Sequence, residues 1–389
     1  MIRRDCTALA SARQDALPGR TRRRVLTILL VCLAWATVGF GPPILTSGGT
    51  PPAWRLDPAQ VQALVAAVRM PAITAKAALL ADASTGHVLL ASHADDPLPP
   101  ASATKIMTAL LVLERADPDA LVTVPAEALI GEASMGLTPG ERLTVRDLLY
   151  GLLLASGNDA AVTLASHVAG SPDAFVALMN QRAAELGLRA SHFANPHGLD
   201  APNHVMSAAD LLTVTRAALA YDLFAAIVAT PQTRVAGHLL VNRNELLTTY
   251  PGADGVKTGT TDAAGECLVA SASRSGLRAI AVILGSRDRY ADSRALLDHY
   301  FQHYTRFDPA LPRSALSRRR WLDGRVRELV AETTPATTPT VVLPRWQQPL
   351  ARPVLHLEGD GAPGTPAGKL TFYVGPRAVA EAPLRWQEP

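Results

Sequence analysis

The feature that most constrains the fold of this chain is the placement of its few lysines. Only four of its 37 basic residues are lysines, and two of them stand in the short motifs Ser102-Ala103-Thr104-Lys105 and Lys257-Thr258-Gly259. Arginine stays protonated at any workable pH, whereas a lysine beside other positive charge can lose its proton and act as a base. The motifs therefore predict a nucleophile site, and they require a fold that brings 102–105 and 257–259 into one cleft.

Ser102 and Lys105 have the spacing of a nucleophile and its base. Pro99-Pro100-Ala101 cannot continue a helix backwards, so Ser102 is expected at the start of a helix, where residues three apart share a face. A serine hydroxyl becomes a strong nucleophile when a base takes its proton, and Lys105 can do so if its proton affinity is lowered. The positive end of the helix and a second ammonium, from Lys257, would both lower it.

Each motif taken alone has an ordinary structural explanation. Ser102 is then a helix-capping serine, Ser156-Gly157-Asn158 a turn between helices, and Lys257-Thr258-Gly259 the edge of a hairpin. The three motifs in this order, each at the boundary of an expected element, favour the catalytic interpretation.

The order of the expected elements indicates an α+β fold with an antiparallel β-sheet flanked by helices and a helical subdomain. Strand-like runs flank a turn at Ser84-Thr85-Gly86, and a long block with helical periodicity follows. The expected strands are 77–80, 87–90, 239–241, 266–271 and 278–284, and the expected helices are 59–69, a block at 102–220 with turns at 139–140, 171–172 and 195–198, and 293–304.

The two ends of the chain differ from this body. Residues 1–24 hold seven arginines against two aspartates, and the apolar stretch 25–40 follows. We predict a signal peptide or uncleaved anchor at 1–45 and a linker with a short helix at 46–70. Prolines, threonines and short apolar runs predict a linker and a small β-rich domain at 306–389, which leaves 71–305 as the catalytic domain.

Charge and cysteine content narrow the function further. The first 24 residues carry a charge of +5, so the rest of the chain carries 3 − 5 = −2, and no nucleic-acid partner is indicated. Cys267 is the one cysteine outside the first 45 residues, so neither an internal disulfide nor a cysteine-based metal site is expected. We predict no metal and no cofactor.

The three motifs and their surroundings closely resemble the low-molecular-mass D-alanyl-D-alanine carboxypeptidases of the serine penicillin-binding protein superfamily, over about residues 71 to 303. The resemblance implies the transpeptidase-like fold shared with serine β-lactamases. Beyond the motifs, it rests on Asp82-Ala83-Ser84-Thr85-Gly86, Pro99-Pro100-Ala101, Met107-Thr108, Leu148-Leu149-Tyr150-Gly151-Leu152-Leu153, Met179-Asn180, Asn195-Pro196-His197-Gly198-Leu199 and Asp254-Gly255-Val256.

The resemblance also implies a role for each motif residue. Ser102 would attack the carbonyl between two D-alanines of a peptidoglycan stem peptide, with Lys105 as its base, and form an acyl-enzyme. Ser156, helped by Lys257, would pass a proton to the leaving amine, and Asn158 would hold the peptide and orient Lys105. The oxyanion would be bound by the backbone N–H groups of Ser102 and Thr260. The implied substrate-binding residues are Thr258, Gly259, Thr260 and Arg289, with Arg287 and Arg294 as competitors for binding the substrate carboxylate.

The implied partners are a stem peptide ending in D-Ala-D-Ala and β-lactam antibiotics as covalent inhibitors. The implied location is extracytoplasmic, in the cell envelope, either periplasmic or at the outer face of the plasma membrane. Membrane contact would come from residues 25–40, because 378–389 contain prolines and lack the amphipathic stripe with which the family often ends.

Other functions stay open. A class A β-lactamase shares the three motifs but needs a glutamate over the acyl-enzyme; residues 193–198 contain none and Glu185 lies in a helical pattern, so slow penicillin hydrolysis is expected. A D,D-endopeptidase would cut cross-links with the same site. A zinc peptidase using His192, His197 and His204 lacks an H-x-x-x-H pair. A non-enzymatic cell-wall-binding protein with a retired site would show damaged motifs, and none is found.

Overall fold

The structure is a computed structural model. It describes residues 45–46, 57–307, 319–320, 326–331, 341–358, 362 and 364–387. Residues 1–44 of the predicted signal or anchor segment lie outside the described residues, as do parts of the predicted linker and β-rich domain at 306–389. In the part of the chain that is described, no single helix is long and apolar enough to cross a membrane. Helices Ala208–Leu219 and Asp222–Val228 reach that length and apolar content only when taken together, and the chain bends sharply between them.

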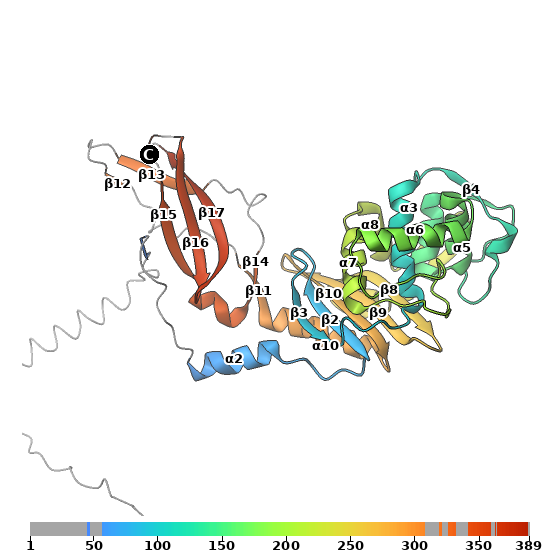
Figure 1. Cartoon of the computed structure of the whole chain (residues 1–389), viewed down its shortest axis with the longest axis horizontal. Coiled ribbons are helices and arrows are strands. Elements are labelled where there is room, and N and C mark those ends of the chain that lie inside the picture. The colour runs from blue at the N-terminus through green and yellow to red at the C-terminus, as the bar shows by residue number, and fades with distance from the viewer. Residues whose placement is uncertain are drawn as a thin grey trace, which may run out of the picture.

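A five-stranded antiparallel sheet in the order β3-β2-β10-β9-β8 lies at the centre of the larger body (Figure 1). Strand β2 pairs here with β10, which comes much later in the sequence. The predicted turn at Ser84-Thr85-Gly86 is held by the Asp82 carboxylate, which accepts hydrogen bonds from Ser84 and Thr85. The strands are β2 (Ala77–Asp82), β3 (Val88–Ser92), β8 (Ala253–Thr261), β9 (Gly265–Arg274) and β10 (Leu277–Ser286).

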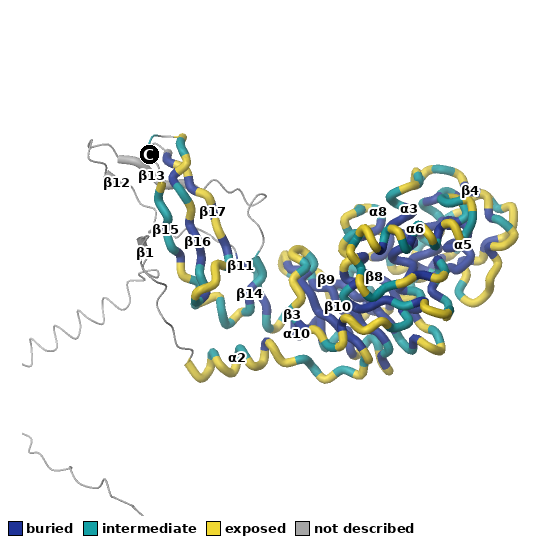
Figure 2. Tube along the Cα trace, in the orientation of Figure 1, coloured by how far each residue is buried: buried dark blue, intermediate teal, exposed yellow. Residues whose placement is uncertain are grey.

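Both faces of this sheet are buried (Figure 2). Successive residues of a strand point to opposite faces, so Leu80 and Leu268 pack toward the closing helix α10 (Arg289–His303), whereas Leu79 and Val269 pack toward the helical subdomain. A strand with one face in water alternates apolar and polar residues, whereas a strand buried on both faces is apolar throughout. The apolar runs in the sequence of these strands therefore follow from burial on both faces.

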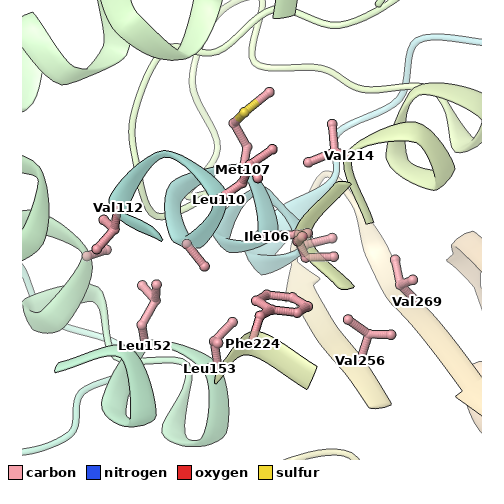
Figure 3. Packing of buried hydrophobic residues seen from close by; sticks show 14 of the residues in the cluster. Ile106, Met107, Leu110, Val112, Leu152, Leu153, Val214, Phe224, Val256 and Val269 are labelled. Atoms are coloured by element: carbon pink, nitrogen blue, oxygen red, sulfur yellow. The ribbon is translucent and has the colours of Figure 1, made fainter. Parts of the chain in front are cut away.

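Helix α3 (Lys105–Arg115) lies in the middle of the helical subdomain, and every residue from Lys105 to Val112 is buried. Figure 3 shows Ile106 and Leu110 of α3 surrounded by apolar side chains of other elements, including Phe224 and Val256. Truncating a fully buried leucine such as Leu110 to alanine costs about 2–5 kcal/mol. The packing therefore fixes the N-terminus of α3, where the Ser102 motif lies.

The other elements of the body are helices around α3, a short helix before the sheet, and small hairpins. They are α2 (Pro58–Val68), η1 (Ala101–Thr104), β4 (Leu121–Thr123), η2 (Ala126–Ala128), β5 (Arg142–Thr144), α4 (Val145–Tyr150), the π-helix η3 (Gly151–Ala155), α5 (Asn158–Ala169), α6 (Pro172–Glu185), α7 (Ala208–Leu219), α8 (Asp222–Val228), β6 (Gln232–Val235), β7 (His238–Val241) and α9 (Leu246–Thr249).

The expected helical block at 102–220 is wrong in two places. Between α3 and α4 the chain forms the β4–β5 hairpin, where Pro118, Pro125 and Pro139 interrupt helical hydrogen bonding. Between α6 and α7 it runs without a helix and makes single bridges such as His192 to Val205. These two irregular segments contribute residues to the cleft described below.

Five C-terminal strands and the two-residue strand β1 form a second, six-stranded sheet in the order β1-β15-β16-β17-β13-β12 (Figure 1). Its core contains Leu370, Phe372 and Trp386. Residues 377–387 form strand β17, which pairs with β16 on one side and with β13 on the other. The bounds are β1 (Leu45–Thr46), β11 (Tyr304–Phe307), β12 (Arg319–Arg320), β13 (Val326–Ala331), β14 (Val341–Pro344), η4 (Arg345–Leu350), β15 (Arg352–Leu357), β16 (Pro366–Val374) and β17 (Arg377–Gln387), with β11 and β14 paired apart from the sheet.

Candidate active site

Two glycines allow the chain to pack tightly around Ser102, which lies in the turn η1 just before α3. Gly198 has φ +91°, and a Cβ there would overlap the carbonyl oxygen of Ala101. Gly259 on β8 is also close to this turn, since a Cβ on it would stand 2.9 Å from the backbone nitrogen of Ser102. Side chains at either position would push the loop or the strand away from the turn that holds Ser102.

Lys105 is fully buried, and its Nζ atom contacts three oxygens. It lies 3.0 Å from Ser102 Oγ, 2.7 Å from Asn158 Oδ1 and 2.6 Å from the carbonyl oxygen of His197. Burial lowers the pKa of Lys105 well below its ordinary value, and the charges of Lys257 and Arg243 lower it further. A neutral amine has two N–H groups and one lone pair. The amide and carbonyl oxygens match the two N–H groups, which leaves the lone pair directed at the hydroxyl of Ser102.

Lys257 on β8 forms a second buried pair with a serine. Its Nζ donates to Ser156 Oγ at 3.0 Å and to the carbonyl oxygen of Thr258 at 2.9 Å. Burial lowers the pKa of Lys257 to about 7, with the charges of Arg243 and Arg289 acting in the same direction. Near neutral pH this side chain therefore exchanges readily between its ammonium and amine forms.

Asn158, the first residue of α5, is positioned by the loop at residues 131–137. Its backbone N–H donates to the carbonyl of Ala133 at 2.7 Å, and its Nδ2 donates to the carbonyl of Gly131 at 3.2 Å. The next residue, Asp159, is buried and accepts hydrogen bonds from Ser134 and from successive backbone N–H groups at 135–137. This carboxylate fixes the loop, and the loop fixes the amide that orients Lys105.

These side chains border one cleft of about 420 Å³. Lys105 and Lys257 lie beneath its floor, where water does not reach them. The structure thus brings all the predicted site residues together. The lining residues are Ser102, Glu132, Ala133, Ser156, Asn158, Leu199, Arg243, Thr258, Gly259, Thr260, Arg289 and Tyr290.

Of the three candidate arginines, Arg289 lies at the cleft. It donates to Thr260 Oγ1 at 2.6 Å and to the Gly259 carbonyl at 2.8 Å, and it pairs with Glu266 at 3.2 Å. Arg287 and Arg294 do not line the cleft, and Arg294 donates instead to Thr249 on α9.

The sequence patterns do not predict Arg243 and Glu132, which also line the cleft. Arg243 contributes positive charge that lowers the pKa of both lysines. It follows β7 in a polar stretch, Asn242-Arg243-Asn244, that carries no motif. Only the three-dimensional structure places it over the buried amines.

The histidines of the zinc alternative are engaged elsewhere. His204 accepts from the Ala194 N–H through Nδ1, which leaves Nε2 to donate to Thr104 at 2.8 Å, and burial lowers the pKa of His204 to about 4. His197 accepts from the Leu199 N–H, and burial lowers its pKa to about 3. Among the described residues, no group of three His, Cys, Asp or Glu side chains is arranged to hold a metal ion.

A family model described as D-alanyl-D-alanine carboxypeptidase matches residues 64–288, which is more than half of the chain. The chain belongs to this family of serine peptidases. The D-alanyl-D-alanine carboxypeptidase DacF of Bacillus subtilis is 40% identical over 244 residues, 59% of this chain and 63% of DacF, so the match spans less than two thirds of that relative. DacC of Escherichia coli is 33% identical over 338 residues, 82% of this chain and 84% of DacC.

The solved structures confirm the expected fold of this carboxypeptidase family member. The D-alanyl-D-alanine carboxypeptidase DacD from Francisella tularensis superposes with a TM-score of 0.63, covering 82% of this chain and 94% of that one at 24% identity. The α+β class with an antiparallel sheet and a C-terminal β-rich part is therefore correct.

Proposed function

We propose that the chain is a serine carboxypeptidase that removes the terminal D-alanine from peptidoglycan stem peptides through an acyl-enzyme on Ser102. The observation that carries this proposal is the pair of buried amine–hydroxyl contacts at one cleft. Lys105 Nζ lies 3.0 Å from Ser102 Oγ, and Lys257 Nζ lies 3.0 Å from Ser156 Oγ. Each serine has a proton acceptor or donor within hydrogen-bond reach, as acyl transfer requires.

Acylation begins when Ser102 Oγ attacks the carbonyl carbon between the two D-alanines. The neutral amine of Lys105 takes the hydroxyl proton, and the fixed oxygens of Asn158 and His197 hold that amine in line. General-base catalysis of this kind contributes about 10²- to 10⁴-fold. The backbone N–H groups of Ser102 and Thr260 are proposed to bind the developing oxyanion, where one donor contributes about 3 kcal/mol.

Departure of D-alanine requires a proton on its nitrogen. Ser156 supplies the proton from its hydroxyl and regains one from the ammonium of Lys257. The carbon–nitrogen bond breaks as the carbonyl re-forms, which leaves an ester on Ser102. Lys105 passes the proton that it took from Ser102 to the amine of Lys257, which restores both side chains. Water then attacks the ester, Lys105 takes a proton from this water and returns it to Ser102 Oγ, and the shortened peptide leaves with a new carboxyl group.

The free carboxylate of the substrate needs a cationic clamp. Arg289 presents a guanidinium at the cleft, and its side chain is braced by Thr260 and Glu266. We assign the carboxylate to Arg289 together with the hydroxyls of Thr258 and Thr260, because planar guanidinium groups bind carboxylates in two parallel hydrogen bonds.

A β-lactam would acylate Ser102 in the same way, and its release should be slow. Glu185 lies in α6 and pairs with Arg182 at 3.0 Å, so it is not held over the nucleophile. We place the enzyme outside the cytoplasm, with any membrane contact made by residues 25–40. We also propose that residues 71–305 form the catalytic domain and that residues 306–389 form a linker and a small β-rich domain.

Release of D-alanine from Nα,Nε-diacetyl-L-lysyl-D-alanyl-D-alanine tests the proposal. The full chain should release it, Ser102→Ala should not, and Lys105→Ala should be slower by about 10²- to 10⁴-fold. Lys369→Ala is the matched control, since this exposed lysine pairs with Glu381 in the C-terminal sheet. An active Ser102→Ala enzyme would rule the mechanism out.

A further inference from the structure

Glu132 brings negative charge to a cleft whose other charged lining residues, Arg243 and Arg289, are cationic. Its side chain is exposed, and its carboxylate makes no hydrogen bond or ion pair with any residue that the structure describes. The mechanism above does not use it. A carboxylate that borders a substrate cleft without a protein partner is available to a cation on the substrate.

The backbone holds Glu132 in a fixed place. Its φ of +57° is in the left-handed region that side chains other than glycine rarely adopt. The peptide groups on both sides are fastened to Asn158, because the carbonyls of Gly131 and Ala133 accept from its side chain and backbone. Such a conformation persists where surrounding contacts determine it. The loop therefore presents the carboxylate at a defined point of the cleft wall.

This point lies beside Asn158 in the cleft. Glu132 flanks Asn158 and is near enough to Lys105 for its charge to raise the pKa of that amine. Arg289 instead affects Lys257 and contacts Thr260. If Arg289 holds the terminal carboxylate, the part of the peptide before the two D-alanines extends from Ser102 toward Glu132.

We propose that Glu132 is a specificity residue that binds the ammonium group on the side chain of the residue preceding D-Ala-D-Ala. This inference rests on the proposed carboxypeptidase function. It assigns the substrate class as peptides with a free side-chain amine at that position, over peptides in which this amine is acylated. A lysine-type amine has an ordinary pKa of about 10.4 and is protonated at neutral pH.

The test compares two substrates on the same enzyme. One is Nα-acetyl-L-lysyl-D-alanyl-D-alanine with a free ε-amine, and the other is its Nα,Nε-diacetyl form. The full chain should show a kcat/KM ratio on the order of fivefold in favour of the free amine at low salt, and this ratio should shrink as salt screens the pair. Glu132→Gln should bring the ratio to about one, and Glu132→Lys should invert it.

Glu127→Gln is the matched control, because Glu127 is exposed in the same segment and does not line the cleft. It should keep the wild-type ratio. A purely electrostatic effect of Glu132 on Lys105 would change both substrates equally and leave the ratio unaltered, and that result would overturn the proposal. A wild-type ratio of one would also overturn it. If wild type released D-alanine from neither substrate, the carboxypeptidase function itself would fail and take this inference with it.

Discussion

Replacing Lys257 by methionine should make the protein more stable at neutral pH and remove a pH dependence of its stability. Lys257 is fully buried, and burial lowers its pKa from 10.5 to about 7. Below pH 7 the folded and unfolded chains both hold the proton, so the folded chain bears the whole cost of the buried charge. At about 1.4 kcal/mol per pH unit, this cost is about 5 kcal/mol.

Between pH 7 and 10.5 the unfolded chain keeps the proton and the folded chain loses it, so the free energy of unfolding rises with pH. From pH 7 to pH 9.5, wild type should gain about 3 kcal/mol relative to Lys257→Met. Lys105 adds to the trend with the same sign, because its pKa is also lowered, mainly by burial and further by the charge of Lys257.

Urea unfolding of both proteins at the two pH values measures this difference. Lys369→Met is the control, since the pKa of this exposed lysine is raised by Glu381 and its proton stays on in both states over this range. The stability of Lys369→Met relative to wild type should not change with pH. If the difference between wild type and Lys257→Met stayed constant as well, Lys257 would carry an ordinary pKa and the buried-amine account would be refuted.

Three further substitutions test how the site is built. Gly198→Ala should slow acylation by penicillin severely, because its Cβ would overlap the Ala101 carbonyl in a left-handed backbone; a stopped-flow rate near wild type would contradict this. Arg289→Lys should raise KM for the peptide by on the order of tenfold through loss of a bidentate contact, whereas Arg287→Lys should not change it in the same assay. Asp159→Asn should lower the free energy of unfolding by about 2–4 kcal/mol, since several N–H donors at 135–137 would face an amide; urea melts with an unchanged midpoint would disprove it.

Sequence patterns predict those parts of the fold that depend on contacts between residues close together in the sequence. The hairpin at Ser84-Thr85-Gly86 forms because a nearby carboxylate, Asp82, satisfies the turn. Strands β9 and β10 are continuous apolar runs and are found where expected. The family resemblance extends this to the overall fold, whereas the sheet order is contained in no local pattern.

The patterns fail where distant contacts decide the structure. They do not predict β8 as a strand, because Gly255, Gly259 and the polar residues between them have low strand propensity. Pairing with β9 fixes this strand, and it carries Lys257 to the cleft. Arg243 and Glu132 reach the site only through the packing of irregular loops, so no spacing rule finds them. The roles of the site residues and the division of the chain into domains stay predictions.

The central claim is that a buried neutral amine activates Ser102. Incubating the full chain with a fluorescent penicillin, digesting it and mapping the label by fragmentation mass spectrometry tests this most directly. A single adduct on Ser102 is expected, and it should form about 10²- to 10⁴-fold more slowly in Lys105→Ala. Label on another residue, or an unchanged rate in Lys105→Ala, would contradict it.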